Sequence, residues 1–184
     1  MAADDADFCR SMLYEAAFWR PGRTDCPRPP RDEALQAAEL ALYVRGWGRA
    51  GDRGLVATAG TQRLGAAWFR LFSHDQPGYG FVDPQTPELT IAVLAALRGK
   101  GVGRALLAAS LLQARLDGFE AVSLSVEPDN PALALYQSAG FRMVEAVGTA
   151  WIMLARLSRS SSGRLIRTRQ IVAVPRRAGD KHPD

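Results

Sequence analysis

A glycine-rich junction near the middle of the chain limits the possible folds more than any other stretch. Residues 88–97 are mostly apolar, residues 98–104 carry three glycines and three cations, and residues 104–117 have a helical pattern free of Gly and Pro. We read this as a strand, a loop and a helix. Amides at such a junction have no acceptor within the chain, so they converge on an anion.

The loop itself has the chemistry of a phosphate cradle. Gly101 and Gly103 carry no Cβ that would hold a phosphate oxygen away from the backbone. The positive charges around it are Arg98, Lys100 and Arg104. A P-loop would need Ser or Thr after the lysine, and the dinucleotide fingerprint would need glycine in place of Leu106. An ordinary glycine-rich turn between strand and helix stays open as an alternative.

A second block lies downstream. Residues 121–126 alternate like a strand, residues 127–131 break the pattern, and residues 132–139 have helical composition, with Pro131 suited to the first turn. The block then reads Asn130-Pro-Ala-Leu-Ala-Leu-Tyr136-Gln-Ser-Ala-Gly140-Phe141.

Together the two blocks resemble the core of the GNAT superfamily of N-acetyltransferases. The run from Arg98 to Gly103 is similar to its acyl-CoA signature, R-x-x-G-x-G, and the run from Asn130 to Phe141 is similar to its second motif. The resemblance covers residues 53–157 well and the N-terminal helices loosely. It implies an α/β fold (α+β by some schemes), with a mixed, twisted sheet of six to seven strands and helices on both faces. The cofactor would enter where two parallel strands diverge.

The resemblance also implies an activity: transfer of the acetyl group of acetyl-CoA directly to a primary amine, without an acyl-enzyme. The backbone of Ile91, Ala92 and Val93 would bind the pantetheine and offer an N–H to the thioester oxygen. Tyr136 would be the general acid toward the departing thiolate. The remaining cofactor-binding positions would be Arg98, Gly99, Lys100, Gly101, Val102, Gly103, Arg104 and Asn130.

The general base is less clearly marked. Glu88 begins the central strand where many relatives have a carboxylate acting through water. Its side chain and that of Val93 would face opposite ways in a regular strand, unless a bulge intervenes or Val93 acts through its backbone. Relatives that modify protein N-termini have a glutamate where this chain has Ser125. Glu127, two residues on, and water alone remain alternatives.

The N-terminal region predicts helices but no first strand. Residues 5–19 place apolar side chains at helical spacing behind an acidic first turn, and residues 32–44 follow a similar pattern. Most of the family begins with a strand before the first helix, whereas only four residues precede it here. Either that strand is absent, the start was placed too late, or another segment covers the sheet edge.

Further strands are expected at 54–58 and 64–72, and a closing hairpin at 142–147 and 149–157. Residues 73–87 form a long insertion rich in Gly, Pro and Asp. Such a loop at the mouth of a site is often functional. Five aromatic side chains could line an acceptor pocket or simply pack in the core: Trp47, Trp68, Phe72, Tyr79 and Phe81.

The positive charge of the chain belongs to its C-terminal end. The net charge is +4, yet residues 158–184 alone hold seven Arg or Lys and two Asp. We therefore expect one acyltransferase domain at 1–157 and a basic extension at 158–184. The extension could be flexible, or could pair through 165–174 with the exposed sheet edge, in the same chain or in a homodimer. Nucleic-acid binding is a third alternative, which the lack of interleaved aromatic residues and of a reading motif disfavours.

Composition excludes several other classes. Two cysteines and two histidines, widely spaced, predict neither a metal site nor a disulfide framework, and Cys9 fits a buried helix position. No apolar run of membrane-spanning length and no signal peptide are visible, so we expect a cytoplasmic enzyme. The acceptor, a small amine or a peptide or protein amine, cannot be read from the sequence. A non-catalytic acyl-CoA sensor remains the alternative.

Overall fold

The protein is built on one mixed, seven-stranded sheet; the computed structural model describes residues 5–20, 28–157 and 172–173. Across the sheet the strands run β5-β6-β4-β3-β2-β1-β7. Their bounds are β1 Arg53–Ala59, β2 Gln62–Arg70, β3 Glu88–Val93, β4 Ala121–Val126, β5 Arg142–Val147, β6 Ala150–Arg156 and β7 Val172–Ala173. The helices are α1 Ala6–Ala17, α2 Arg31–Ala34, α3 Ala38–Ala41, α4 Val102–Leu116 and α5 Leu133–Ser138, with a single 3-10 turn at Ala95–Leu97.

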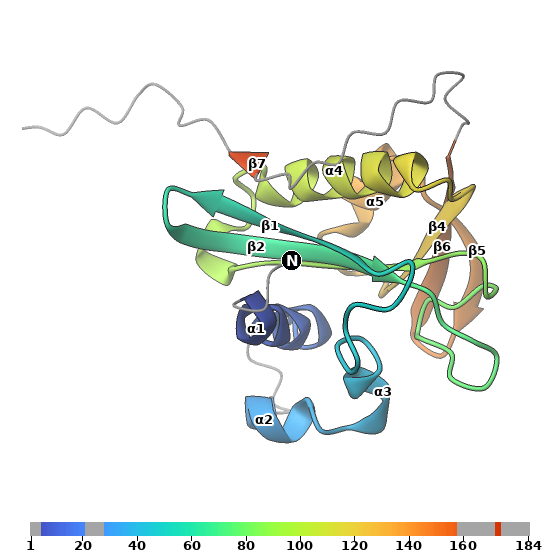
Figure 1. Ribbon diagram of the computed structural model, residues 1–184, viewed down its shortest axis with the longest axis horizontal. Helices are drawn as coiled ribbons and strands as arrows, with labels where there is room; N and C mark the ends of the chain where they lie inside the picture. Colours follow the sequence, from blue (N-terminus) through green and yellow to red (C-terminus); the bar gives the residue numbers. More distant parts are fainter. Residues whose placement is uncertain (1–4, 21–27, 158–171, 174–184) are drawn as a thin grey trace, which may run out of the picture.

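Helices cover both faces of the sheet, as predicted (Figure 1). On β2, Ala67 and Phe69 pack on the α4 side, while Ala66 and Trp68 pack on the α1 side. This strand is therefore apolar on both faces, because each face is buried under a helical layer. Burial of each large apolar side chain in these two cores stabilises the fold by about 1.5–3 kcal/mol.

The centre of the sheet contains the feature that creates the site. β3 and β4 run parallel and pair only at Glu88 and Ser123, whereas β3 is paired with β2 along its whole length. Beyond Glu88 the two parallel strands therefore diverge, and the backbone of β3 on that side is left without a neighbouring strand. The predicted divergence of two parallel strands is confirmed.

The prediction that the second helix is continuous is wrong. The structure has two single-turn helices, α2 and α3, where one helix was expected over 32–44. Ala37 between them is extended, with φ −54° and ψ 131°. No Gly or Pro marks this break, so the local pattern could not predict it. Packing overrides the helical preference of this Ala-, Leu- and Glu-rich segment, because the break allows Leu40 and Tyr43 to join the core on the α1 side.

The open edge expected beside β1 is occupied. Val172 and Ala173 form β7, which runs parallel to β1 at Ala57 and Thr58. Of the explanations for the absent first strand, coverage of that edge by another segment of the same chain is the one observed. The other residues of the proposed extension lie outside the described ranges. In the described part of the chain, no helix has the length and apolar character needed to span a bilayer.

Candidate active site

A cavity of about 930 Å³ opens where β3 and β4 diverge. Its walls come from the end of α1, from α3, from both diverging strands, from the loop before α4 and from α5. Segments far apart in the sequence thus meet at one place, and both predicted catalytic side chains, Glu88 and Tyr136, line it.

The loop before α4 has the geometry of an anion cradle. Gly99 and Gly101 have φ values of 75° and 87°, a left-handed conformation that glycine adopts without the cost of a Cβ. Amides 99–104 donate to no acceptor within the described part of the chain, and Ala105 makes the first helical hydrogen bond, to Gly101. The predicted row of free amides is therefore present.

The side chains of this loop are placed less uniformly than expected. Arg104 lines the cavity, but Lys100 does not. Val102 is 4% exposed and packs in the core, so only its amide faces the cradle side of the helix start. Arg104 also lines a second cavity, of about 410 Å³, between α4 and α5, together with Arg115 and Arg156.

Arg98 lines the cavity and is held by three hydrogen-bond partners. Its guanidinium binds the carboxylate of Glu15 at 2.8 Å and donates to the Trp19 carbonyl at 3.1 Å, and its Nε donates to the Val93 carbonyl at 3.3 Å. It ties the end of α1 to the loop after β3.

The same end of α1 is tied to the loop after β4. The Trp19 indole donates to Glu127 Oε2 at 3.0 Å, and Arg20 pairs with Glu127 at 3.1 Å and also with Asp129. Residues 15–20, here called the α1 strap, therefore span the two diverging strands. The Thr149 hydroxyl also donates to Glu127 Oε1 at 3.4 Å, so three side chains hold this carboxylate.

Glu88 is the most perturbed carboxyl in the cavity. Glu88 is 4% exposed, and its Oε1 accepts a hydrogen bond from the Tyr43 hydroxyl at 2.6 Å. Burial raises the pKa of Glu88 to about 7, and the hydrogen bond from Tyr43 opposes part of that rise. The Gly80 amide also lowers this pKa, although it does not reach hydrogen-bond geometry with Oε2. A carboxyl that titrates near neutrality can accept and release a proton there.

The pairing of β3 with β2 settles how Glu88 and Val93 are related. The register runs without a shift from Val93 opposite Gly65 to Glu88 opposite Arg70. There is no bulge, so the two side chains face opposite sides of the sheet. Of the two routes considered from the sequence, only a backbone role for Val93 is compatible with this strand.

Tyr136 and Asn130 both line the cavity from the β4–α5 side. Tyr136 is 8% exposed, its ring packs edge-on against Phe141 at 5.9 Å between centroids, and burial raises its pKa. The phenol is therefore protonated at neutral pH. Asn130 Oδ1 accepts the Ala132 amide at 2.9 Å, which fixes the turn into α5. Its amide nitrogen has no hydrogen-bond partner in the described part of the chain.

Of the two alternatives for the five aromatic side chains, packing in the core is observed for most of them. Tyr79 lines the cavity. Trp68 and Phe72 are buried in the core, and Trp47 and Phe81 pack against that core. Cys9 is buried as predicted, at 1% exposed. Within the described residues, no cluster of His, Cys, Asp or Glu could hold a metal ion.

Sequence reasoning missed Tyr43, which is 45 positions from the carboxyl that it binds. It also missed the partners of Arg98 on the α1 strap. One signal was available for a related contact: Arg70 interrupts an apolar strand, and a charge buried there needs a partner.

Comparison with known proteins agrees with this geometry. Residues 14–141 match the model of the acetyltransferase (GNAT) family. No curated protein matches the sequence. Among solved structures, the PaiA N-acetyltransferase of Thermoplasma acidophilum in complex with coenzyme A has a TM-score of 0.64 and 16% identity, over 85% of this chain and 95% of that one.

Two further structures cover similar shares. YncA of Salmonella typhimurium, solved with acetyl-CoA, has a TM-score of 0.63 and 20% identity over 90% of this chain and 96% of that one. The ribosomal-protein-alanine N-acetyltransferase of Brucella melitensis has a TM-score of 0.61 and 23% identity over 85% and 97%. At these identities the likeness establishes the fold.

Proposed function

Because this chain belongs to the GNAT family of acetyltransferases and is therefore an acetyl-CoA-dependent acyltransferase, we propose that it transfers an acetyl group directly to a primary amine. One observation carries the proposal. A row of free amides at the start of α4 opens onto a cavity that also contains a buried carboxyl and a buried phenol, Glu88 and Tyr136.

The donor end of the site is formed by backbone and cationic groups. Amides 99–104 are suited to bind the diphosphate of acetyl-CoA, with Arg104 beside them. Arg115 and Arg156 in the adjoining cavity would hold the 3′-phosphate. The unpaired side of β3 over Ile91–Val93 would bind the pantetheine and stabilise the negative charge that develops on the thioester oxygen.

The acceptor end is closed by apolar and aromatic side chains around one carboxyl. Leu13, Leu40 and Tyr43 line it together with Glu88. An alkyl amine with a pKa near 10 is only about one part in a thousand neutral at pH 7. We assign Glu88 the role of removing the ammonium proton, directly or through water, so that the neutral amine attacks the thioester carbon.

Tyr136 completes the reaction on the opposite side of the cavity. As the new C–N bond forms, the C–S bond breaks and the thiolate leaves. The Tyr136 hydroxyl would give its proton to that sulfur, the attacking nitrogen would lose its second proton to solvent, and solvent would reprotonate the phenol. Burial raises the pKa of Tyr136, so the phenol carries the proton at neutral pH that this role requires.

The test is a turnover assay across a panel of alkyl amines, aryl amines, polyamines, amino acids and peptides. We expect release of free CoA thiol with at least one amine and a mass increase of one acetyl group on that amine. Binding of acetyl-CoA by calorimetry without transfer to any amine would overturn the proposal in favour of an acyl-CoA sensor.

A further inference from the structure

The Glu88 carboxyl is held asymmetrically. Tyr43 donates its hydroxyl hydrogen to Oε1 at 2.6 Å, and the same hydroxyl oxygen accepts the Tyr79 amide at 2.7 Å. Oε2 is buried and has no hydrogen-bond partner in the described part of the chain. One oxygen is therefore fixed and the other keeps its capacity to accept a proton.

The loop before β3 covers this pair at very close range. A Cβ on Gly78 would lie 2.2 Å from Glu88 Oε2 and 2.9 Å from the Tyr43 hydroxyl oxygen. Any side chain at position 78 would therefore displace the carboxyl, the phenol or the loop. The absence of a side chain allows the loop to seal the pair from that side.

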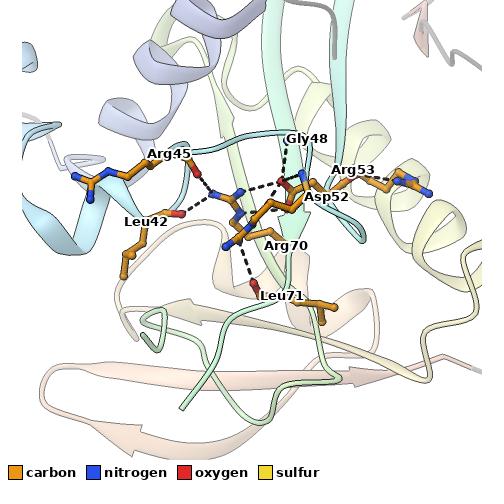
Figure 2. A network of polar contacts seen from close by, with 8 residues as sticks. Leu42, Arg45, Gly48, Asp52, Arg53, Arg70 and Leu71 are labelled. Atoms are coloured by element: carbon orange, nitrogen blue, oxygen red, sulfur yellow. Dashed lines mark hydrogen bonds and ion pairs between the residues drawn. The ribbon is translucent and has the colours of Figure 1, made fainter. Parts of the chain in front are cut away.

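The backbone around Tyr43 is fixed in turn by a buried ion pair (Figure 2). Arg70 is 0% exposed and donates to both oxygens of Asp52, at 3.2 and 2.8 Å. Its remaining nitrogen donates to the carbonyls of Leu42 at 2.5 Å and Arg45 at 3.1 Å. These two carbonyls lie on either side of Tyr43 in the sequence, so the guanidinium holds the turn that presents the phenol.

The positive charge of Arg70 is compensated by a partner other than Glu88. Although Arg70 is the cross-strand neighbour of Glu88, its guanidinium is paired with Asp52. On the other side Glu88 pairs with Ser123 of β4, which is uncharged. From the covering loop come the Tyr79 phenol and the Gly80 amide, and Tyr79 in turn is near Glu39. Tyr43 is thus the one side chain that hydrogen-bonds Glu88 among the described residues.

We propose that Tyr43 is a positioning residue for proton removal: it donates to Glu88 Oε1 and so fixes the carboxylate that takes up the proton of the acceptor ammonium, and Arg70 with Asp52 fixes the position of Tyr43. This inference rests on the proposed function. The proton passes from nitrogen through water to the carboxylate of Glu88, and the amine lone pair becomes free to attack. Tyr43 keeps its own proton throughout.

Tyr43→Phe tests the inference, because it removes the hydroxyl and keeps the ring. With one donor to the carboxylate lost, the apparent pKa of the acid limb of kcat/KM should rise by about one pH unit. At neutral pH, kcat/KM for the amine should fall about 10-fold. The Kd for acetyl-CoA, measured by calorimetry, should stay within about twofold, since the cradle is untouched.

Tyr14→Phe is the matched control. The Tyr14 hydroxyl also makes one partly buried hydrogen bond, to the Pro29 carbonyl at 2.7 Å, but Tyr14 is not among the residues that line the cavity. The acid limb of kcat/KM against pH for Tyr14→Phe should coincide with that of the unmodified protein. Coincident limbs for Tyr43→Phe and Tyr14→Phe would overturn the inference.

Two further measurements separate this inference from the proposed function. Carbon NMR titration of the Glu88 carboxyl needs no turnover, and its midpoint should rise in Tyr43→Phe; an unchanged midpoint contradicts the inference. In a Glu88→Gln background, Tyr43→Phe should cost nothing further, and additive losses would contradict it. If the unmodified protein acetylates no amine, the proposed function fails whatever the titration shows.

Discussion

Tyr136 is buried and also lines the cavity. This combination suits a general acid better than a purely structural aromatic side chain. We expect Tyr136→Phe to lower kcat by about 10- to 100-fold. The effect stays modest because free CoA thiol, with a pKa near 8.5, already leaves tolerably well. The release of free CoA thiol, sampled at fixed times, measures this loss of kcat, and the affinity for acetyl-CoA is the control. Unchanged turnover in the variant would show that the phenol only packs against Phe141.

The raised pKa of Glu88 also predicts how folding stability depends on pH. The folded carboxyl binds its proton up to about pH 7, whereas its ordinary pKa is 4.5. The stability that this tight proton binding contributes is fully present below about pH 4.5 and is lost as pH rises through about 7.

Glu88→Gln removes that titration. We therefore expect the urea midpoint of the unmodified protein, relative to the variant, to fall between about pH 4.5 and 7 and to be level outside that window. Glu145→Gln on exposed β5 serves as the background measurement. A relative urea midpoint that is constant across this pH window would show that the pKa of Glu88 is not raised in the folded protein.

At single positions, the sequence predicts most of what depends on neighbouring residues. The glycines of the cradle follow from a short motif with a chain-local cause, whereas Tyr136 and Glu88 were assigned to one site through the family resemblance. The bond from Tyr43 to Glu88 and the bond from Arg98 to Glu15 join residues 45 and 83 positions apart. No periodicity or spacing encodes such pairs, since tertiary packing alone brings them together.

At the scale of elements, two glycines of the loop before α4 should respond in opposite ways to alanine. Gly101 has φ 87°, where a Cβ costs about 1–2 kcal/mol. Gly103 lies inside α4, and a Cβ there would meet Leu135 and Val93 only at 3.7 Å. Gly103→Ala should therefore stabilise the helix by about 0.5–1 kcal/mol.

Chemical denaturation measures both changes, and calorimetry measures acetyl-CoA binding. We expect weaker binding in both variants, because Gly101→Ala strains the loop and the added Cβ in Gly103→Ala would stand on the cavity side of the cradle. Unchanged affinity in Gly101→Ala would mean that the left-handed conformation at position 101 does not shape the cradle.

The strands and the long helix after the cradle were predictable because each has a clear period and clear turn residues at its ends. The division of residues 31–41 into α2 and α3 was not, because nothing in that segment breaks a helix. The break is imposed from outside, by the side chains that must reach the α1 side of the sheet.

At the scale of the whole molecule, coverage of the sheet edge can be tested by ending the chain at Leu157. This removes β7 and exposes the outer edge of β1. We expect a lower Tm and concentration-dependent association, because a free edge pairs readily with another strand. Light scattering and thermal melts of the shortened and full chains measure this. An unchanged Tm and mass would show that β7 contributes nothing.

The overall architecture was the most predictable level, because the resemblance to the GNAT family implied both helical layers and the central divergence. For the occupant of the outer edge, the sequence offered residues 165–174 as one of several alternatives, and β7 lies within that range.

The α1 strap has a consequence for the order of events in turnover. It spans the diverging strands and uses Arg98, a residue of the donor motif, as one of its two anchors. A diphosphate that draws Arg98 away from Glu15 would release the strap, so the donor should enter first and the amine second. An unreactive analogue of the amine should then inhibit competitively against the amine and uncompetitively against acetyl-CoA. Noncompetitive inhibition against acetyl-CoA would mean that the two substrates add in either order.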